Sequence, residues 1–519
     1  MFCHDDIVKL RRHLALVVRW QQLKKRGAAI TAVLFFSIFA LVGAIVNVAW
    51  INGPTFSSAA RMALFGTPKG RLKCTNSSGS LKYTCPRNNY PTDHQVRQSS
   101  SSCPSYFQWI HEDLRPWREM GITQDMIRGA RKTAHFKLVI VNGRAYMEKY
   151  KPSLPARDQF TLWGILQLLR WYPGRLPDLE LMFDCDDRPV IRRKDFQGPR
   201  KPPPPPLFRY CRDDWTLDIV FPDWTFWGWH IFLSSWHVYM SCRPDVNIKP
   251  WKQSLKDIKE GNERTVWEER VPYAYWRGNP YVCPSRQDLL KCNVSDKYDW
   301  NARLYIQNWN EQAKAGFKQS NLANQCTHRY KIYVEGWAWS VSEKYIFACD
   351  SMTLRVRPNF YDFFARGMVP LKHFWPIRDN SKCTSLKFAV EWGNNYTDKA
   401  KGIAEAGSQY IHEDVKMEYV YDFMFHILNE YAKLLRFKPT VPAGAVELCP
   451  EVMLCNATGR HKEFMIESMV ESPSESAPCT LPLPYEPAEL QAFLDLKANS
   501  TRQVEMWENE YWQNQNRRN

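Results

Sequence analysis

The sequence predicts an α/β protein with two facing domains behind a single N-terminal membrane anchor. The chain has 519 residues, which is more than one compact domain usually holds. Candidate strands alternate with candidate helices in both halves, as in α/β domains. The net charge is +16, and 44% of the residues are hydrophobic against 24% charged. These values exclude a disordered chain, a collagen and a multi-span membrane protein.

The N-terminal stretch 28–51 is apolar, carries no charge and is long enough to cross a bilayer as a helix. Basic residues far outnumber acidic ones in 1–27, so the positive-inside rule places this tail in the cytosol. The alternative is a cleaved signal peptide. The basic region and the apolar run are both too long for one, and no clear cleavage site follows. We therefore expect a transmembrane signal anchor, with the rest of the chain across the membrane.

Cysteines and glycosylation sequons agree with that compartment. All but one of the 15 cysteines follow the anchor, from Cys74 to Cys479, on the side where disulfides persist. All five N-x-S/T sequons lie there too, at Asn76, Asn293, Asn395, Asn456 and Asn499. Both patterns indicate a single-pass protein of the secretory pathway.

Composition divides the remainder of the chain into four parts. The segment 52–102 is polar and contains many Pro and Ser residues, which predicts a stem. We expect an N-terminal α/β domain over 103–260 and a C-terminal α/β domain over 261–470. The polar residues 471–519 predict a loose C-terminal tail with an amphipathic helix.

Local patterns predict individual elements in each domain. In the first, Asn142-Gly143 after an apolar run predicts a hairpin turn. The other elements expected there are a helix at 164–172 and a strand at 178–183. In the second domain we expect strands at 329–334, 345–349 and 353–356, and a long helix over 413–435.

An acidic run, Asp184-Cys185-Asp186-Asp187, follows the strand expected at 178–183. Three carboxylates at a strand end can hold a cation or remove a proton. One interpretation is a D-x-D metal site that grips a nucleotide-sugar diphosphate, and a second is a single general base. The third is a solvated acidic turn, and the residues alone leave all three open.

Three further segments carry groups suited to a ligand. Aromatic residues crowd 221–229, either as a sugar-stacking platform or as core. Asn279 and Arg286 offer amide and guanidinium donors for a phosphate or a carboxylate, unless they form a surface turn. Residues 335–344 predict a turn into a helix N-terminus, where a pyrophosphate can bind or an ordinary cap forms. No GxGxxG, P-loop or HExxH motif occurs, and the basic residues follow no nucleic-acid-binding pattern.

Seven phrases, taken together in this order, resemble the Rumi-like protein O-glucosyltransferases, glycosyltransferase family 90, in their plant-type branch. They are IHEDLRPWREMGIT (110–123), RLPDLELMFDCDDRP (175–189), DIVFPDWTFWGW (218–229), VNIKPW (246–251), AYWRGNP (274–280), EGWAWSVSEKYIFACDS (335–351) and GSQYIHEDV (407–415). The resemblance implies a GT-B fold, a pair of Rossmann-like domains. It also implies an inverting transfer of glucose (UDP-glucose) or xylose (UDP-xylose) to a hydroxyl of a protein or glycan, in the Golgi or endoplasmic reticulum, without metal or cofactor.

The resemblance also assigns site residues. The base aspartate of the family falls on Asp187, and donor-binding residues fall on Asn279 and Arg286. A turn that contacts the donor falls on Trp337, Ala338, Trp339, Ser340, Val341 and Ser342. Cys326 and Cys349 match a family disulfide with the same separation.

The chain departs from the animal enzymes of this family at three places. It has Ser342 where they carry an arginine, so one diphosphate contact is replaced. The segment 151–161 lacks the cysteines of their acceptor-reading loop, which leaves a protein or a cell-wall glycan equally open as acceptor. An apolar insert, 230–244, separates two motifs that nearly adjoin in the family.

Two other hypotheses compete with this one. The first is a metal-dependent GT-A transferase in which Asp184 and Asp186 hold manganese. The second is a membrane-tethered carbohydrate-binding protein that has lost turnover, which the insert keeps open.

Overall fold

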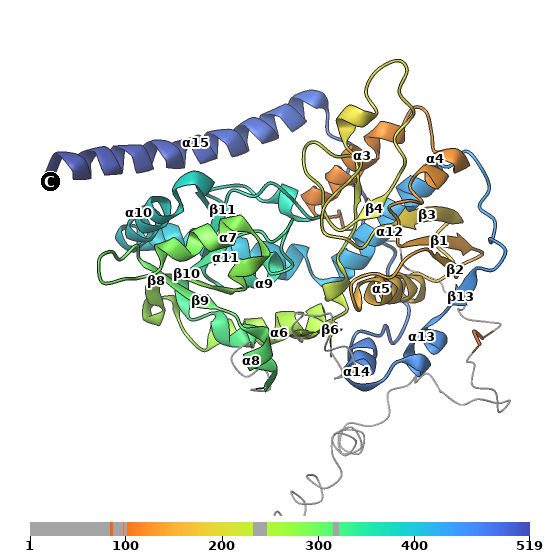
Figure 1. Ribbon diagram of the computed structural model, residues 1–519, viewed down its shortest axis with the longest axis horizontal. Coiled ribbons are helices and arrows are strands. Elements are labelled where there is room, and N and C mark those ends of the chain that lie inside the picture. Colours follow the sequence, from red (N-terminus) through yellow and green to blue (C-terminus); the bar gives the residue numbers. More distant parts are fainter. Residues whose placement is uncertain (1–83, 87–96, 98–100, 232–245, 315–320, 519) are drawn as a thin grey trace, which may run out of the picture. The chain divides into compact units, whose positions relative to one another are not determined.

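The computed structural model describes residues 84–86, 97, 101–231, 246–314 and 321–518 (Figure 1). The predicted anchor and most of the predicted stem lie outside these residues. The strands are β1 (Phe136–Val141), β2 (Arg144–Lys149), β3 (Leu179–Phe183), β4 (Phe208–Arg209), β5 (Ile219–Val220), β6 (Trp229–Ile231), β7 (Val246–Ile248), β8 (Val271–Gly278), β9 (Ala302–Ile306), β10 (His328–Tyr333), β11 (Met352–Val356), β12 (Trp375–Ile377) and β13 (Val446–Leu448).

Helices surround these strands. They are α3 (Trp109–Leu114), α4 (Gln124–Gly129), α5 (Arg157–Trp171), α6 (Trp251–Glu263), α7 (Pro284–Leu289), α8 (Trp309–Lys314), α9 (Glu343–Phe347), α10 (Lys382–Asn395), α11 (Thr397–Gln409), α12 (Met417–Lys433), α13 (Pro450–Asn456), α14 (Gly459–Glu467) and α15 (Pro487–Arg518). In the part of the chain that the structure describes, no helix combines the length and the apolar character needed to span a membrane.

The first sheet has the strand order β13-β2-β1-β3-β4-β5 and contains the predicted hairpin. β1 pairs antiparallel with β2 and β3, whereas β3, β4 and β5 are parallel. Between β1 and β2, Asn142 and Gly143 have φ angles of 52° and 70°. A two-residue hairpin turn needs this left-handed conformation at both positions, and Asn and Gly adopt it at low cost. The predicted hairpin, the helix at 164–172 (in α5) and the strand at 178–183 (β3) are confirmed.

The second sheet is entirely parallel and has the order β12-β11-β10-β8-β9. If β8 is numbered as strand 1 and the sheet is taken from β9 to β12, the order is 2-1-3-4-5, which is that of a doubly wound sheet. The direction in which strands are added reverses between β8 and β10, which end at Gly278 and Tyr333. Ligands of such sheets bind beyond the carboxyl ends of the strands at this switch point. The segments after β8 and β10 are therefore where a ligand site is expected.

One predicted strand, Tyr345–Cys349, is wrong. Residues Glu343–Phe347 form the short helix α9, and the Ile346 amide donates to the carbonyl of Ser342 at 3.0 Å. The segment is rich in aromatic and apolar residues, which favour a strand locally. It connects β10 to the parallel strand β11, however, and a parallel pair needs a crossover connection, usually a helix.

The chain returns to the first sheet after completing the second. The hydroxyl of Tyr431 in α12 donates to the carbonyl of Glu180 in β3 at 2.9 Å, and β13 pairs with β2. The segment 261–470, expected to form one domain, therefore contributes strands to both sheets. The disulfides Cys103–Cys479 and Cys85–Cys449 join the start of the described chain to residues that follow α12.

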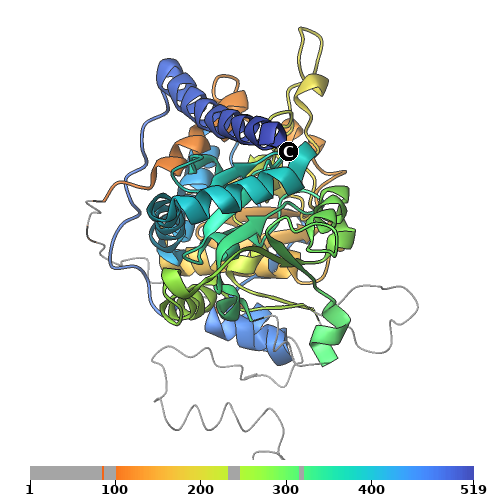
Figure 2. The ribbon, with the colours of Figure 1, turned by 90° about the vertical axis from the view of Figure 1, so that its left-hand side faces the viewer.

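The segment 471–519, expected as a loose tail with an amphipathic helix, contains the helix α15, which packs beside α10 (Figure 2). Val504 is buried in the core of the second sheet, and Trp507 packs against that core. A carboxylate oxygen of Glu508 accepts a hydrogen bond from the Ser385 hydroxyl at 2.8 Å. α15 is therefore part of the second half of the fold rather than loose.

Candidate active site

A cavity of about 460 Å³ lies at the switch point of the second sheet. Gly278 and Asn279 reach it from the end of β8, and Gly336 reaches it from the segment after β10. Its opposite wall comes from the first half of the fold, where Arg157 and Asp187 line it. The two halves therefore enclose the cavity between them.

The cavity brings together almost all site residues that the family resemblance assigns. The predicted residues in its lining are Asp187, Asn279, Arg286, Trp337, Trp339, Ser340, Val341 and Ser342. Ala338 belongs to the same turn, but its side chain is fully buried in the core and does not line the cavity. Segments that are up to 155 residues apart in the sequence thus meet at one place, from Asp187 to Ser342.

The three carboxylates of the acidic run have different environments. Asp184 is buried and forms an ion pair with Arg209, and His135 Nδ1 lies 3.0 Å from its Oδ1. Burial opposes the charge of Asp184, but His135 and Arg209 hold its pKa below the usual range. Asp186 is 54% exposed and does not line the cavity, whereas Asp187 does. The structure therefore separates Asp187 from its two neighbours.

A cation could in principle be held by His135, Asp184 and Asp186, whose side-chain ligand atoms lie within 4.8 Å of one another. Because Arg209 already neutralises Asp184, this cluster has less negative charge left for a cation than its two carboxylates would otherwise supply. It also lies outside the cavity lining, in which Asp187 is the acidic side chain.

Arg157 is the partner of Asp187, and sequence reasoning missed it. Its guanidinium lies 2.8 Å from Asp187 Oδ1, donates to the carbonyl of Cys185 at 2.9 Å and stacks on Trp224 at 4.3 Å. Its side chain is 7% exposed, and that of Asp187 is 28% exposed. An arginine in the first turn of a helix carries no sequence signal for this role, because α5 and the acidic run meet only in the folded chain.

Arg188 links the aspartate loop to the predicted donor turn. Its Nε donates to the carbonyl of Trp337 at 3.0 Å, and its guanidinium stacks on the Trp337 ring at 4.0 Å. The residue next to Asp187 therefore contacts the first residue of the turn, and this contact couples the two walls of the cavity.

Arg286 makes hydrogen bonds that hold the turn Trp337–Ser342 in place. Its guanidinium donates to the carbonyls of Glu335, Asn279 and Val334 and to the hydroxyl of Ser340, at 3.0 to 3.3 Å. Burial lowers its pKa from the usual value for arginine. Because most of its donors are engaged by the protein, Arg286 positions the turn Trp337–Ser342 as well as lining the cavity.

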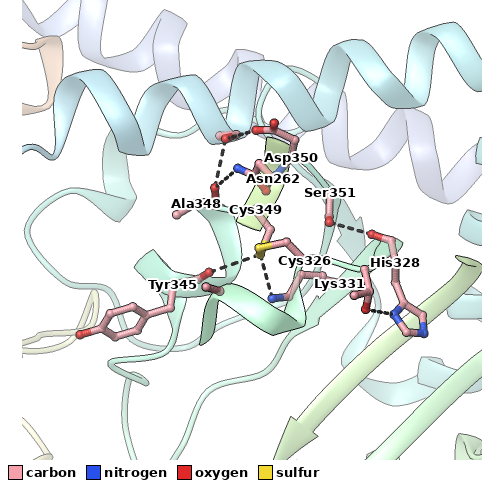
Figure 3. Close-up of a disulfide and its surroundings, with 12 residues drawn as sticks. Asn262, Cys326, His328, Lys331, Tyr345, Ala348, Cys349, Asp350 and Ser351 are labelled. Atoms are coloured by element: carbon pink, nitrogen blue, oxygen red, sulfur yellow. Dashed lines mark hydrogen bonds between the residues drawn. A yellow bond between two sulfur atoms is a disulfide. The ribbon is translucent and has the colours of Figure 1, made fainter. Parts of the chain in front are cut away.

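A hydrogen bond and a disulfide shape the rest of the turn. The Ser340 and Ser342 hydroxyls lie 2.8 Å apart, and α9 begins directly after Ser342. The predicted disulfide Cys326–Cys349 is formed and ties the end of α9 to the segment before β10 (Figure 3). α9 has only five residues, so its backbone dipole offers little of the charge stabilisation expected from a helix N-terminus.

The insert begins in β6 and ends beside β7, which pair as an antiparallel ribbon, Trp229 opposite Ile248. Both of these residues line the cavity. Residues 232–245 lie outside the described part of the chain. The ends of the insert are therefore at the wall formed by the first half of the fold.

Three of the predicted glycosylation sites are exposed, namely Asn395, Asn456 and Asn499. Asn293 is half-buried, and its side-chain amide exchanges hydrogen bonds with the backbone of Leu304. Asn76 lies outside the described residues. The first three can accept a glycan without losing a backbone contact of this kind.

Comparison with known proteins identifies the family. Residues 98–508 match the family model described as glycosyl transferase family 90. Human protein O-glucosyltransferase 1 is 25% identical over 402 residues, covering 76% of this chain and 96% of that protein. The O-glucosyltransferase rumi homolog of Aedes aegypti is 26% identical over 357 residues, covering 67% of this chain and 83% of that protein. Since the model spans most of the sequence, the chain belongs to glycosyltransferase family 90 and is a glycosyltransferase.

Proposed function

We propose that this glycosyltransferase moves glucose or xylose from a UDP-sugar to a hydroxyl of a protein or glycan, with inversion at the sugar carbon. One observation carries the proposal: Asp187 and the turn Trp337–Ser342 line the same cavity from opposite halves of the fold. A single displacement needs base, acceptor hydroxyl and donor carbon in one place. The relatives named protein O-glucosyltransferase support glucose as the sugar.

Asp187 is the general base of the proposed reaction. Its carboxylate removes the proton of the acceptor hydroxyl while the oxygen attacks C1 of the sugar and the bond from C1 to the diphosphate oxygen breaks. Arg157 holds Oδ1 at 2.8 Å, and Oδ2 makes no hydrogen bond to the described residues. Oδ2 is therefore the oxygen available to the hydroxyl.

The proposed fold is GT-B, a pair of Rossmann-like domains. The doubly wound order of the second sheet and the site at its switch point support this assignment. We also propose that no metal takes part, because Arg209 neutralises Asp184 and because Asp184 and Asp186 lie outside the cavity lining.

The proposed location is the lumen of the Golgi or endoplasmic reticulum, with the chain anchored as a type II membrane protein. Four disulfides that join pairs of described cysteines, together with three exposed sequons, support an oxidising compartment with N-glycosylation. We also propose that the chain belongs to the plant-type branch of the family and that its acceptor is a protein or a glycan.

Asp187→Asn tests the proposed function. The amide keeps the size of the side chain and an oxygen for Arg157 but cannot accept the proton. We expect turnover to fall about 100-fold or more, the usual share of a general base, with UDP affinity nearly unchanged. The assay measures UDP release by the purified chain from UDP-glucose and UDP-xylose, against a panel of peptides and glycans.

Asp186→Asn is the matched control, because it makes the same chemical change one residue away, outside the cavity lining. It should keep most of the turnover. Loss of turnover in Asp186→Asn with a normal Asp187→Asn would refute the assignment of the base. A folded wild-type chain that binds UDP but transfers no sugar would favour a carbohydrate-binding protein instead.

A further inference from the structure

Lys331 is a buried lysine at the centre of the second sheet, and none of the roles above uses it. It lies in β10, in register with Tyr275 of β8 and Thr353 of β11. Its residue is only 4% exposed, yet it lines the cavity that Asn279 and Ser342 also line. β10 is one of the two strands at the switch point, where ligands of doubly wound sheets bind.

The ammonium group of Lys331 has no anionic partner among the described residues. Its Nζ contacts the sulfur of Cys349 at 3.1 Å, in the disulfide with Cys326 (Figure 3). A disulfide sulfur is a weak acceptor, and Nζ forms no ion pair with a carboxylate among the described residues. Burial, together with the positive charge of Arg270, lowers the pKa of Lys331 to about 7.

A buried lysine without a counter-charge is costly to keep protonated, so it is normally paired or loses its proton, and an anion bound beside it restores its charge. The disulfide gains nothing from a charged neighbour, and a neutral side chain of similar length would fill the same space. The position of this lysine at a ligand cavity therefore indicates that the missing negative charge comes from the ligand.

The other cations of the cavity are already engaged. Arg157 pairs with Asp187, and Arg286 donates to backbone carbonyls. Arg277 donates from Nε to the side chain of Gln307 at 2.7 Å. The turn Trp337–Ser342 carries no basic side chain, and α9 is too short to supply an effective helix dipole.

We infer that Lys331 is an anion-binding residue of this cavity and that it pairs with the diphosphate of the nucleotide-sugar donor. This inference rests on the proposed function, because it takes a UDP-sugar as the ligand. In the reaction, the ammonium group would stabilise the charge that gathers on the diphosphate as the bond to the sugar breaks. A carboxylate on the sugar offers the same chemistry, and the experiment separates the two sources.

The test is calorimetric binding of UDP, UDP-glucuronate, uridine and inorganic pyrophosphate to the purified full chain and to Lys331→Gln. Loss of a charge-assisted contact should weaken UDP and pyrophosphate about 10- to 100-fold. Uridine lacks the phosphates, so its affinity should stay within about twofold of the wild-type value. Lys331→Arg keeps the charge and should recover part of the loss. Lys291→Gln is the control, since it removes a 76% exposed charge from the same half of the fold.

Each other outcome overturns part of the reasoning. Equal UDP binding by wild type and Lys331→Gln refutes the inference and leaves the proposed function intact. If UDP and uridine lose affinity equally, Lys331 only supports the shape of the site. That result also refutes the inference. Weakening confined to UDP-glucuronate, with UDP unaffected, assigns the anion to a sugar carboxylate instead. A folded wild-type chain that binds no UDP refutes the proposed function and the inference together.

Discussion

Replacing Arg157 with methionine tests whether the ion pair with Asp187 organises the site. Methionine keeps most of the apolar stem but removes the contact to Asp187 Oδ1 at 2.8 Å and the hydrogen bond to the carbonyl of Cys185 at 2.9 Å. The Asp187 side chain is 28% exposed, so water can replace part of what it loses. The carbonyl of Cys185 belongs to a fully buried residue and has no such replacement.

The magnitude follows from these two environments. An unsatisfied buried acceptor costs about 1–3 kcal/mol, and the partly exposed carboxylate adds little, so we expect a similar loss of about 1–3 kcal/mol in the free energy of unfolding. Asp187 also loses the contact that fixes its rotamer. A misplacement of the reacting group by about 1 Å can cost on the order of 100-fold, so turnover should fall about 10- to 100-fold with little change in UDP affinity.

The assay measures urea unfolding and UDP release in a double-mutant cycle. The cycle compares wild type, Arg157→Met, Asp187→Asn and the variant that carries both changes. If Arg157 acts through Asp187, adding Arg157→Met to Asp187→Asn should lower turnover by no more than about twofold. Arg157→Lys, which can reach the carboxylate with a single donor, should fall between wild type and Arg157→Met. Wild-type turnover in Arg157→Met would refute the role of the ion pair. Independent losses that multiply in the double variant would show that Arg157 acts elsewhere.

Two further predictions concern packing and metal. A Cβ at Gly164 in α5 would lie 2.5 Å from the buried ring of Trp227, whereas one at Gly402 in α11 meets no atom within 4 Å. In thermal or urea unfolding, Gly164→Ala should lose about 1–3 kcal/mol by overpacking and Gly402→Ala should gain about 0.5–1 kcal/mol; equal gains in both would contradict the packing argument. Turnover should survive extensive dialysis against a chelator, because Arg209 already neutralises Asp184. Full loss that manganese restores would instead assign a cation to the group His135, Asp184 and Asp186.

Most local elements followed from patterns that neighbouring residues set. The turn at Asn142-Gly143 needs two residues with positive φ, and Asn and Gly supply them. The helix at 164–172 and the strand β3 follow from the spacing of apolar residues. The segment Tyr345–Cys349 failed because its composition favours a strand, while its position between two parallel strands requires a crossover.

The candidate site was predictable only as far as the family phrases reached. They named Asp187, Asn279, Arg286 and the turn Trp337–Ser342, all but Ala338 of which the structure brings to one cavity. They gave no reason to single out Arg157, Arg188 or Lys331. Each of these owes its importance to a partner on another element, and no period or spacing in the sequence records that partner.

By itself, the sequence determined the α/β class, the family and the residues from which the site is built. Only the tertiary structure decided the partners of the acidic run: Arg209 and His135 contact Asp184, whereas Asp187 pairs with Arg157 at the cavity. It also decided that the helix of the C-terminal segment packs on the second half of the fold and that a lysine lines the cavity beside a disulfide. The physical reason is common to these cases. Local conformation depends on residues a few positions away, whereas burial, charge pairing and cavity shape depend on which distant segments the packed core brings into contact.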